Sequence, residues 1–278
     1  MLRKRSIPIF FVLPERQIYT ATSMTSGPPS PAIEIRHCTT LEEYEECVRV
    51  EHITWGPELA EPTGMFVVAH HTGGQVFAAF DGAKMVGFTL AVAGARAGKT
   101  FLHSHQTAVL PEYRDRGVGR RLKLFQREDA LRRGINLVEW TFDPLELKNA
   151  HFNLVRLGAV ARRLIPNCYG ITKSPLHSGL PTDRLVAEWW LDSARVTAIL
   201  ENNPLRSKGL VERVPLPANI GEIKAQDPAA AIRVQTGLRG QLLRAFAEGQ
   251  VATAVEARVA RTDYILEPAG QIAGLYLF

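Results

Sequence analysis

The fold of this chain follows from Pro111-Glu-Tyr-Arg-Asp-Arg-Gly-Val-Gly-Arg120, a turn rich in glycine and arginine that joins an apolar strand to a helix. The strand ends at Pro111, and apolar residues at helical spacing then continue to Gly134. The glycines therefore lie at the helix N-terminus, where the helix dipole favours negative charge. Because Gly117 and Gly119 lack a Cβ atom, backbone N–H groups can close on an anion. The stretch predicts a phosphate-binding turn.

The residues after the turn predict a regular alternation of elements. Residues 136–142 are typical of a buried strand, and Asp143 and Pro144 predict the start of a helix that ends at Gly158. Residues 160–165 predict another strand.

The motif Arg114-x-x-Gly117-x-Gly119, with the elements that follow it, resembles the GNAT superfamily of N-acetyltransferases over roughly residues 32 to 175. The resemblance implies an α+β fold (mixed α/β), in which helices flank a twisted mixed central sheet. It also implies that acetyl-CoA or another acyl-CoA binds as co-substrate, with its pantetheine on the strand end and its pyrophosphate on the turn. A glycine-rich start of a surface helix is the alternative. The coenzyme-binding residues that the resemblance implies are Ala108, Val109, Arg114, Asp115, Arg116, Gly117, Val118, Gly119 and Arg120.

The helix that ends at Gly158 departs from the GNAT pattern at two positions. GNAT enzymes often carry a tyrosine where Leu154 stands, as the acid that reprotonates the coenzyme A thiolate, and an asparagine where Leu147 stands. Asn149 and Asn153, spaced i and i+4, share one face of the expected helix and suit hydrogen bonds to the pantetheine arm. A solvated flank of the helix is the alternative.

His103 and His105 point to one face of the strand before the turn, because side chains alternate along a strand. An amine must be neutral to attack a thioester, and this strand carries the base in some GNAT enzymes. We therefore expect His105 or His103 to be catalytic, with Glu139 as a further base unless it faces outward, and Tyr169 as the acid. Structural or substrate-contacting roles are the alternatives. Without a third ligand, the two histidines predict no metal site.

The residues before the turn predict the usual opening of a GNAT domain. Acidic residues in the first turn of the first helix suit the helix dipole, and Asp-Gly favours a tight hairpin. The expected elements are a strand over 32–36, a helix over 41–55, a hairpin over 76–80 and 85–92 joined by Asp81-Gly82, and a strand over 100–109.

Composition and charge are those of a soluble enzyme. The chain has 278 residues, of which 46% are hydrophobic, enough for one large core or two modest ones. The net charge of +5 is mild and the arginines gather near the turn, so we expect an anionic cofactor and no nucleic acid. No apolar run is long enough to cross a membrane. Three cysteines without Cys-x-x-Cys spacing argue against a disulfide framework and favour a reducing, cytoplasmic setting.

The sequence divides into three parts. Residues 1–31 predict a disordered extension, in which Met24 could be the true start, and residues 32–178 the acyltransferase domain. Residues 179–278 predict a smaller α+β subdomain packed on the core. The subdomain could shape the acceptor pocket, form the surface of a homodimer, or both. Its expected elements are a strand over 184–191, a helix over 227–249, and a hairpin over 251–260 and 264–266.

The resemblance implies an acyl-CoA-dependent N-acyltransferase. The acyl group, for which acetyl is the first candidate, would pass to a small molecule whose amine attacks the thioester directly, with no covalent enzyme intermediate. An acyl-CoA-binding regulator without turnover is the alternative, which the missing helix tyrosine supports. A nucleic-acid binder would instead show an affinity for DNA or RNA that depends on salt.

Overall fold

A computed structural model describes residues 33–171, 179–203, 211–272 and 274–275 of the chain. The expectations for residues 1–31, including a start at Met24, lie outside the described residues. None of the described helices combines the length and the apolar character that crossing a bilayer requires.

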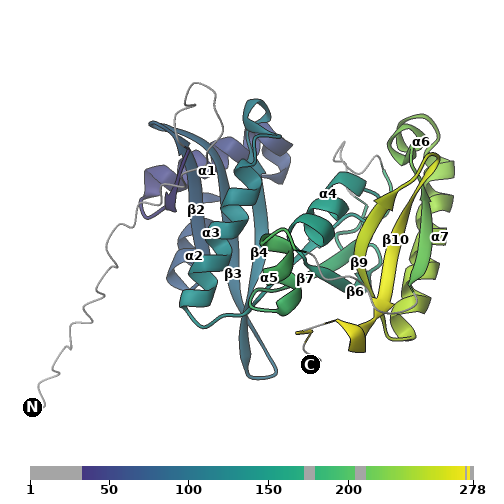
Figure 1. The fold of residues 1–278 in the computed structure, drawn as a ribbon. Coiled ribbons are helices and arrows are strands. Elements are labelled where there is room, and N and C mark those ends of the chain that lie inside the picture. Colours follow the sequence, from purple (N-terminus) through teal and green to yellow (C-terminus); the bar gives the residue numbers. More distant parts are fainter. Residues whose placement is uncertain (1–32, 172–178, 204–210, 273, 276–278) are drawn as a thin grey trace, which may run out of the picture.

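The described strands form one mixed sheet in the order β1-β2-β3-β4-β5-β7-β6-β9-β10-β8 (Figure 1). Neighbouring strands are antiparallel except for β4 and β5, which are parallel. The mixed sheet with its flanking helices confirms the expected α+β fold. The strands are β1 (Glu34–His37), β2 (Gln75–Asp81), β3 (Lys84–Arg96), β4 (Lys99–Val109), β5 (Leu137–Phe142), β6 (Val160–Ile165), β7 (Arg184–Trp190), β8 (Glu212–Pro217), β9 (Gln250–Ala257) and β10 (Arg261–Pro268).

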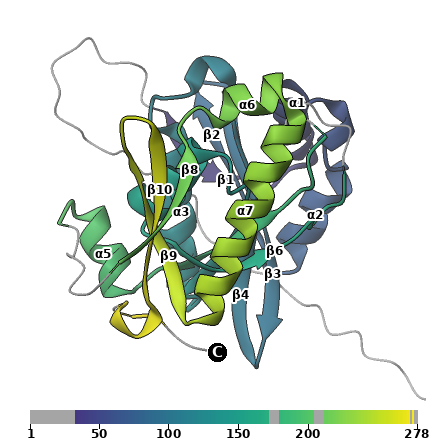
Figure 2. The same ribbon diagram turned by 90° about the vertical axis from the view of Figure 1, so that its right-hand side faces the viewer.

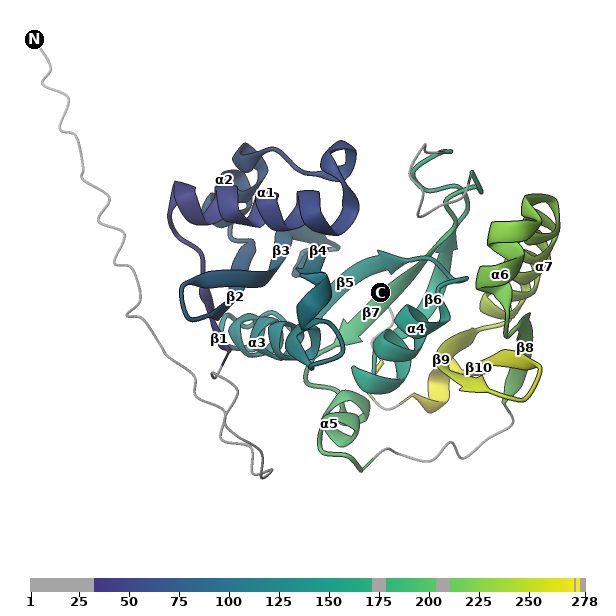
Figure 3. The ribbon, with the colours of Figure 1, turned by 90° about the horizontal axis from the view of Figure 1, so that it is seen from above.

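Helices cover both faces of the first strands, with α1 and α2 on one side and α3 on the other (Figure 3). Helix α1 begins at a capping box in which the Thr40 hydroxyl accepts from the Glu43 N–H, while the Glu43 carboxylate accepts from the Thr40 N–H. The helices are α1 (Leu41–Trp55), α2 (Thr63–His71), α3 (Val118–Arg132), α4 (Leu147–His151), α5 (Ala194–Leu200), α6 (Ile220–Gln226) and α7 (Pro228–Ala247).

Strand β2 shows why two helical layers form. Val76, Ala78 and Phe80 pack with α1 and α2, whereas Phe77 and Ala79 pack with α3. Because side chains alternate along a strand, a strand covered on both faces is apolar at nearly every position. The same sheet therefore has two separate apolar layers on its first half.

Two local expectations from the sequence are wrong. The Asp143 carboxylate accepts from the N–H of Leu145 and closes a turn, so α4 begins only at Leu147. The helix then passes into a π-helical turn over Phe152–Arg156. In the hairpin, β2 extends through Asp81, and the two connecting residues are Gly82 and Ala83.

The C-terminal part of the chain completes the sheet of the first part, and Figure 2 shows its helix α7 beside β8, β9 and β10. Strand β7 lies between β5 and β6 and pairs with both. Leu238 and Leu242 of α7 belong to the same buried apolar cluster as Leu154 and Leu185, so the two parts share a core. The boundary expected at residue 178 stays a prediction, and the place of β7 favours a division after Trp190.

Arg195 of α5 joins the two parts through backbone carbonyls. Its Nη2 atom donates to the carbonyls of Leu154, at 3.2 Å, and Thr253, at 2.7 Å, and its Nε atom donates to the carbonyl of Gly158 at 3.2 Å. One guanidinium therefore ties the π-helical turn to β9. Burial lowers the pKa of Arg195.

We expect Arg195→Met to lower the free energy of unfolding by about 2–4 kcal/mol, because three buried carbonyls lose their donor. Urea unfolding followed by circular dichroism measures the change. Arg233→Met is the matched control: Arg233 is 71% exposed on α7, and its loss should change stability by less than about 0.5 kcal/mol. Equal stability of the two variants would contradict the role of Arg195 in joining the two parts of the chain.

Candidate functional site

The glycine turn leaves open space above the start of α3. Gly117 is the N-cap of α3 with a left-handed φ of 78°, and no side chain caps the helix. A Cβ atom placed on Gly117 would have no neighbour within 4 Å, and one on Gly119 would meet only Val109 Cγ2, at 3.8 Å. The first N–H groups of a helix have no partner within it. The turn therefore combines N–H groups without a side-chain cap, a positive helix end and open space.

The arginines around the turn do not all face the same way. Arg114 Nε donates to the Val109 carbonyl at 3.2 Å, and the Arg116 guanidinium lies 5.4 Å from the centroid of the Tyr113 ring. Arg121, which precedes the second turn of α3, donates to the carbonyl of Ile33 and so supports β1. The Nε atom of Arg120 is buried and has no hydrogen-bond partner among the described residues.

Strands β4 and β5 diverge just before this turn. Their parallel ladder consists of Leu102 with Val138 and His103 with Glu139, although β4 continues to Val109. The register of β4 against β3 also shifts by one residue, which leaves His105 as the bulged residue. Beyond His103, the edge of β4 that faces β5 therefore offers backbone groups without a ladder partner. Ala108 and Val109 lie in this stretch, where the resemblance predicts the pantetheine, and the Val109 carbonyl accepts from Arg114 Nε.

His105 makes a hydrogen bond with the loop that joins α1 to α2. His105 Nε2 lies 2.8 Å from Glu61 Oε1, and the Glu61 N–H donates to Glu51 Oε2 at 3.1 Å. A carboxylate only accepts, so Nε2 carries the proton and Nδ1 keeps a free lone pair in the neutral imidazole. Glu51 is fully buried, and burial raises its pKa to about 7.

His103 is more enclosed than His105. Burial lowers the pKa of His103, and the neighbouring His105 acts in the same direction. The two ring centroids are 6.3 Å apart. Glu139, the further candidate base, does not face outward: Arg96 donates to both of its carboxylate oxygens at 2.8 and 2.9 Å, and Arg163 also pairs with it. These ion pairs leave the histidines as the better bases.

Tyr169 lies at the opening between β4 and β5. Its hydroxyl is 2.8 Å from the Thr141 hydroxyl, and its ring is half exposed. Thr141 and His105 each stand two residues beyond the last ladder pair, His103 with Glu139. His105 thus belongs to β4, whereas Tyr169 lies in the turn after β6 and contacts β5 through Thr141.

Asn149 and Asn153 do not share a face as the sequence predicts. Asn149 is exposed, whereas Asn153 is buried and its Nδ2 atom has no hydrogen-bond partner among the described residues. The π-helical turn that begins at Phe152 takes the i, i+4 pair out of line. Leu154, which stands where GNAT enzymes often have tyrosine, is fully buried in the core. Asn153 therefore has a buried donor without a partner among the described residues.

Lys123 of α3 is a buried cation that the sequence did not reveal. Its Nζ atom donates to Ser104 Oγ at 2.7 Å and to Gln126 Oε1 at 3.0 Å, and lies 4.0 Å from the centroid of the Trp140 ring. Ser104 belongs to β4 and Trp140 to β5, so Lys123 bridges the two strands where they part. Burial lowers the pKa of Lys123 from 10.5 to about 7.

We expect the stability of the protein to rise with pH between about pH 7 and pH 10 through Lys123, by about 1 kcal/mol per pH unit. In this window the unfolded lysine holds a proton that the folded one has released, so the unfolded state binds more protons. Lys123→Met should remove this rise. Urea unfolding of both proteins at about pH 7 and about pH 9 gives the comparison, and parallel pH dependences would contradict the assignment.

Among the described residues, no three His, Cys, Asp or Glu side chains are grouped so as to hold a metal ion. A search of curated proteins gives no match.

One family model and several solved structures match this chain. Residues 33–158 match the model of the Acetyltransferase (GNAT) family. An acetyltransferase assigned to the GNAT family from Desulfovibrio desulfuricans is 18% identical, with a TM-score of 0.47 over 58% of this chain and 99% of that one. The ribosomal-protein-S18-alanine N-acetyltransferase of Escherichia coli is 15% identical, with a TM-score of 0.45 over 63% and 97%. Chaetomium thermophilum Naa20, solved with a bisubstrate analogue, is 15% identical, with a TM-score of 0.47 over 63% and 93%.

Proposed function

We propose that the chain transfers an acyl group, with acetyl as the first candidate, from coenzyme A to the amine of a small molecule, because residues 33–158 match the model of the Acetyltransferase (GNAT) family. The observation that supports the proposal best is the uncapped glycine turn at the start of α3, next to the unpaired edge of β4. Free donors and empty space there suit a pyrophosphate followed by an amide-bearing arm.

The residues around the turn suit acyl-coenzyme A. The N–H groups of residues 117–120 would hold the pyrophosphate, with Arg114, Asp115 and Arg116 at its rim. The free edge of β4 at Ala108 and Val109, and the unpartnered Nδ2 of Asn153, would bind the pantetheine arm. When bound, the coenzyme supplies a thioester carbon that an amine can attack.

Two residues near the point where β4 and β5 diverge would transfer the protons. His105 Nδ1 would accept the proton that the attacking amine must lose, and Glu61 would fix the imidazole in the tautomer that exposes Nδ1. Tyr169 would return a proton to the departing thiolate. As the carbon–nitrogen bond forms and the carbon–sulfur bond breaks, one proton leaves the amine and one reaches the sulfur.

A second candidate function is an acyl-CoA-binding regulator without turnover. The buried Leu154, in place of a tyrosine on the helix, favours it. Release of free coenzyme A from acetyl-CoA, measured with a panel of small amines, separates the two functions. Binding without release for any amine would support the regulator.

We expect Gly119→Val to weaken coenzyme A binding by about 100-fold or more, because the branched side chain would fill the space over the turn. The backbone of Gly119 needs no left-handed φ and has room for a Cβ atom, so the fold should persist. Gly221→Val is the matched control, since Gly221 is also the second residue of a helix with open space around it. Calorimetric titration with coenzyme A measures both; unchanged affinity in Gly119→Val would exclude the turn as the binding site.

We expect His105→Gln to lower kcat by about 100-fold or more with little change in the affinity for acetyl-CoA, because a proton acceptor is lost from the transition state. Glu61→Gln should lower kcat by about 10-fold, since the imidazole loses its fixed tautomer. His103→Gln is the control on the same strand. A larger loss of kcat in His103→Gln than in His105→Gln would reassign the base.

A further inference from the structure

Lys123 of α3 lies at the vertex where β4 and β5 diverge. The last ladder pair of the two strands is His103 with Glu139. Ser104 and Trp140 are the residues that follow this pair on β4 and β5. The Nζ atom of Lys123 lies 2.7 Å from Ser104 Oγ and 4.0 Å from the centroid of the Trp140 ring. One amino group therefore contacts both strands at the point where they part.

Hydrogen bonds within the protein keep Lys123 at this vertex. Gln126 Oε1 accepts from Lys123 Nζ at 3.0 Å, and Gln126 Nε2 donates to Gln75 Oε1 at 3.1 Å. Gln75 Nε2 donates in turn to Asp129 Oδ2 at 2.8 Å. Because each amide both donates and accepts, the chain fixes the Gln126 oxygen toward Lys123. Two amides separate the Asp129 carboxylate from the lysine.

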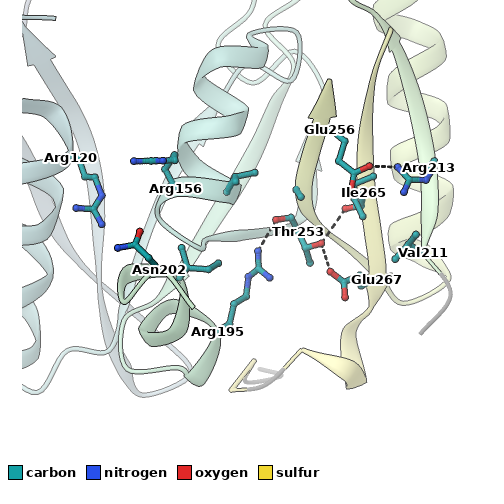
Figure 4. A pocket seen from close by; sticks show the side chains of 13 residues that line it. Arg120, Arg156, Arg195, Asn202, Val211, Arg213, Thr253, Glu256, Ile265 and Glu267 are labelled. Carbon is teal, nitrogen blue, oxygen red and sulfur yellow. Dashed lines mark hydrogen bonds and ion pairs between the residues drawn. The ribbon is translucent and has the colours of Figure 1, made fainter. Parts of the chain in front are cut away.

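Lys123 differs from two other enclosed cations because it has no counter-ion or row of carbonyls. Lys224 Nζ lies 2.7 Å from Glu146 Oε1. Arg195 lines a cavity of about 620 Å³ and donates to backbone carbonyls, and Figure 4 shows its bond to the Thr253 carbonyl. Among the described residues, no carboxylate pairs with Lys123, and burial lowers its pKa to about 7. A charged ammonium group in such surroundings requires an anion.

The proposed position of the coenzyme directs the acyl group toward the vertex. The pyrophosphate would lie on the turn at residues 117–120, and the pantetheine would follow the edge of β4 from Val109. Since the turn comes after β4 in the chain, the arm runs against the direction of the strand and reaches His105 before Ser104. With the thioester beside His105, the acyl group is the part of the ligand that approaches Ser104 and Lys123.

We propose that the acyl group ends in a carboxylate, as in the coenzyme A thioesters of short dicarboxylic acids, and that Lys123 binds this carboxylate. The proposal rests on the proposed function, since it assumes that the coenzyme lies along β4, and it deepens that function by naming an acyl group other than acetyl. Lys123 supplies the counter-ion, and the Ser104 hydroxyl is a second donor beside it. The amine attacks the thioester carbon and the carbon–sulfur bond breaks, while the carboxylate end undergoes no bond change.

Calorimetric titration of the full chain with succinyl-CoA and butyryl-CoA tests the proposal. The two acyl groups have carbon chains of equal length, and only succinyl ends in a carboxylate. The wild-type protein should bind succinyl-CoA about 10- to 100-fold more tightly, the effect of a hydrogen bond to a charged group. Lys123→Met should bind the two esters equally. Lys224→Met is the matched control and should keep the wild-type ratio, because Lys224 is a buried lysine with its own carboxylate partner.

Proton uptake by the wild-type protein is a second measurement, which needs no variant to fold. At about pH 8, Lys123 of the free protein is mostly neutral, and a bound carboxylate restores its charge. Binding of succinyl-CoA should therefore take up about one proton more than binding of butyryl-CoA, measured by titration in two buffers of different ionisation enthalpy. Titratable groups near the vertex also include His103 of β4, Asp129 of α3 and Glu139 of β5. His103→Gln should show the same uptake as the wild type.

The outcomes separate this proposal from the proposed function. Equal wild-type affinities for the two esters, or uptake of the same number of protons, would overturn the assignment of the acyl group and leave coenzyme A binding intact. A preference for succinyl-CoA that survives in Lys123→Met would also overturn it, because the carboxylate would then be recognised elsewhere. Binding of neither ester would overturn the proposed function and, with it, the role of Lys123.

Discussion

The divergence of β4 from β5 after two ladder pairs is the constraint on which the site depends. Backbone N–H and C=O groups at the centre of a protein need partners, and a strand that leaves its neighbour inside a sheet gives them up. In this protein the strands diverge just before the glycine turn. The edge of β4 that leaves β5 and the uncapped start of α3 consequently follow one another along the chain, an arrangement that suits the extended, phosphorylated ligand proposed for this site.

The divergence is stable because β5 is held firmly from its other side. All six residues of β5 pair with β7, and Glu139 stands opposite Glu188. Arg96, Arg162 and Arg163 surround the two buried carboxylates. Burial alone would raise the pKa of Glu139, but hydrogen bonds and ion pairs with Arg96 and Arg163 offset burial and hold the pKa below its usual value. This ionic cluster fixes the last point at which β4 and β5 touch.

Features that depend on local chemistry could be predicted from the sequence. Helix α1 has the expected bounds, and the strand, glycine turn and helix α3 lie where Pro111 and the two glycines indicate. Features that are set by packing could not be predicted from the sequence. Helix α2 has no capping side chain, Asn153 is rotated by a π-helical turn, and Lys123 is buried by β4 and β5 rather than by a pattern of its own helix. One cavity is lined by residues from Arg120 to Glu267, more than a hundred positions apart, and no local spacing in the sequence encodes such a cavity.

The position of β7 also bears on how the chain folds as it is synthesised. Strand β6 leaves the ribosome before β7, yet β7 lies between β6 and β5. Until residue 190 emerges, the edges of β5 and β6 have no strand to join them, and the apolar side chains that β7 will cover stay in water. Non-local pairing of this kind is slow, and unpaired strand edges favour aggregation. Between the synthesis of β6 and that of β7, a nascent chain of this protein therefore exposes unpaired strand edges that favour aggregation.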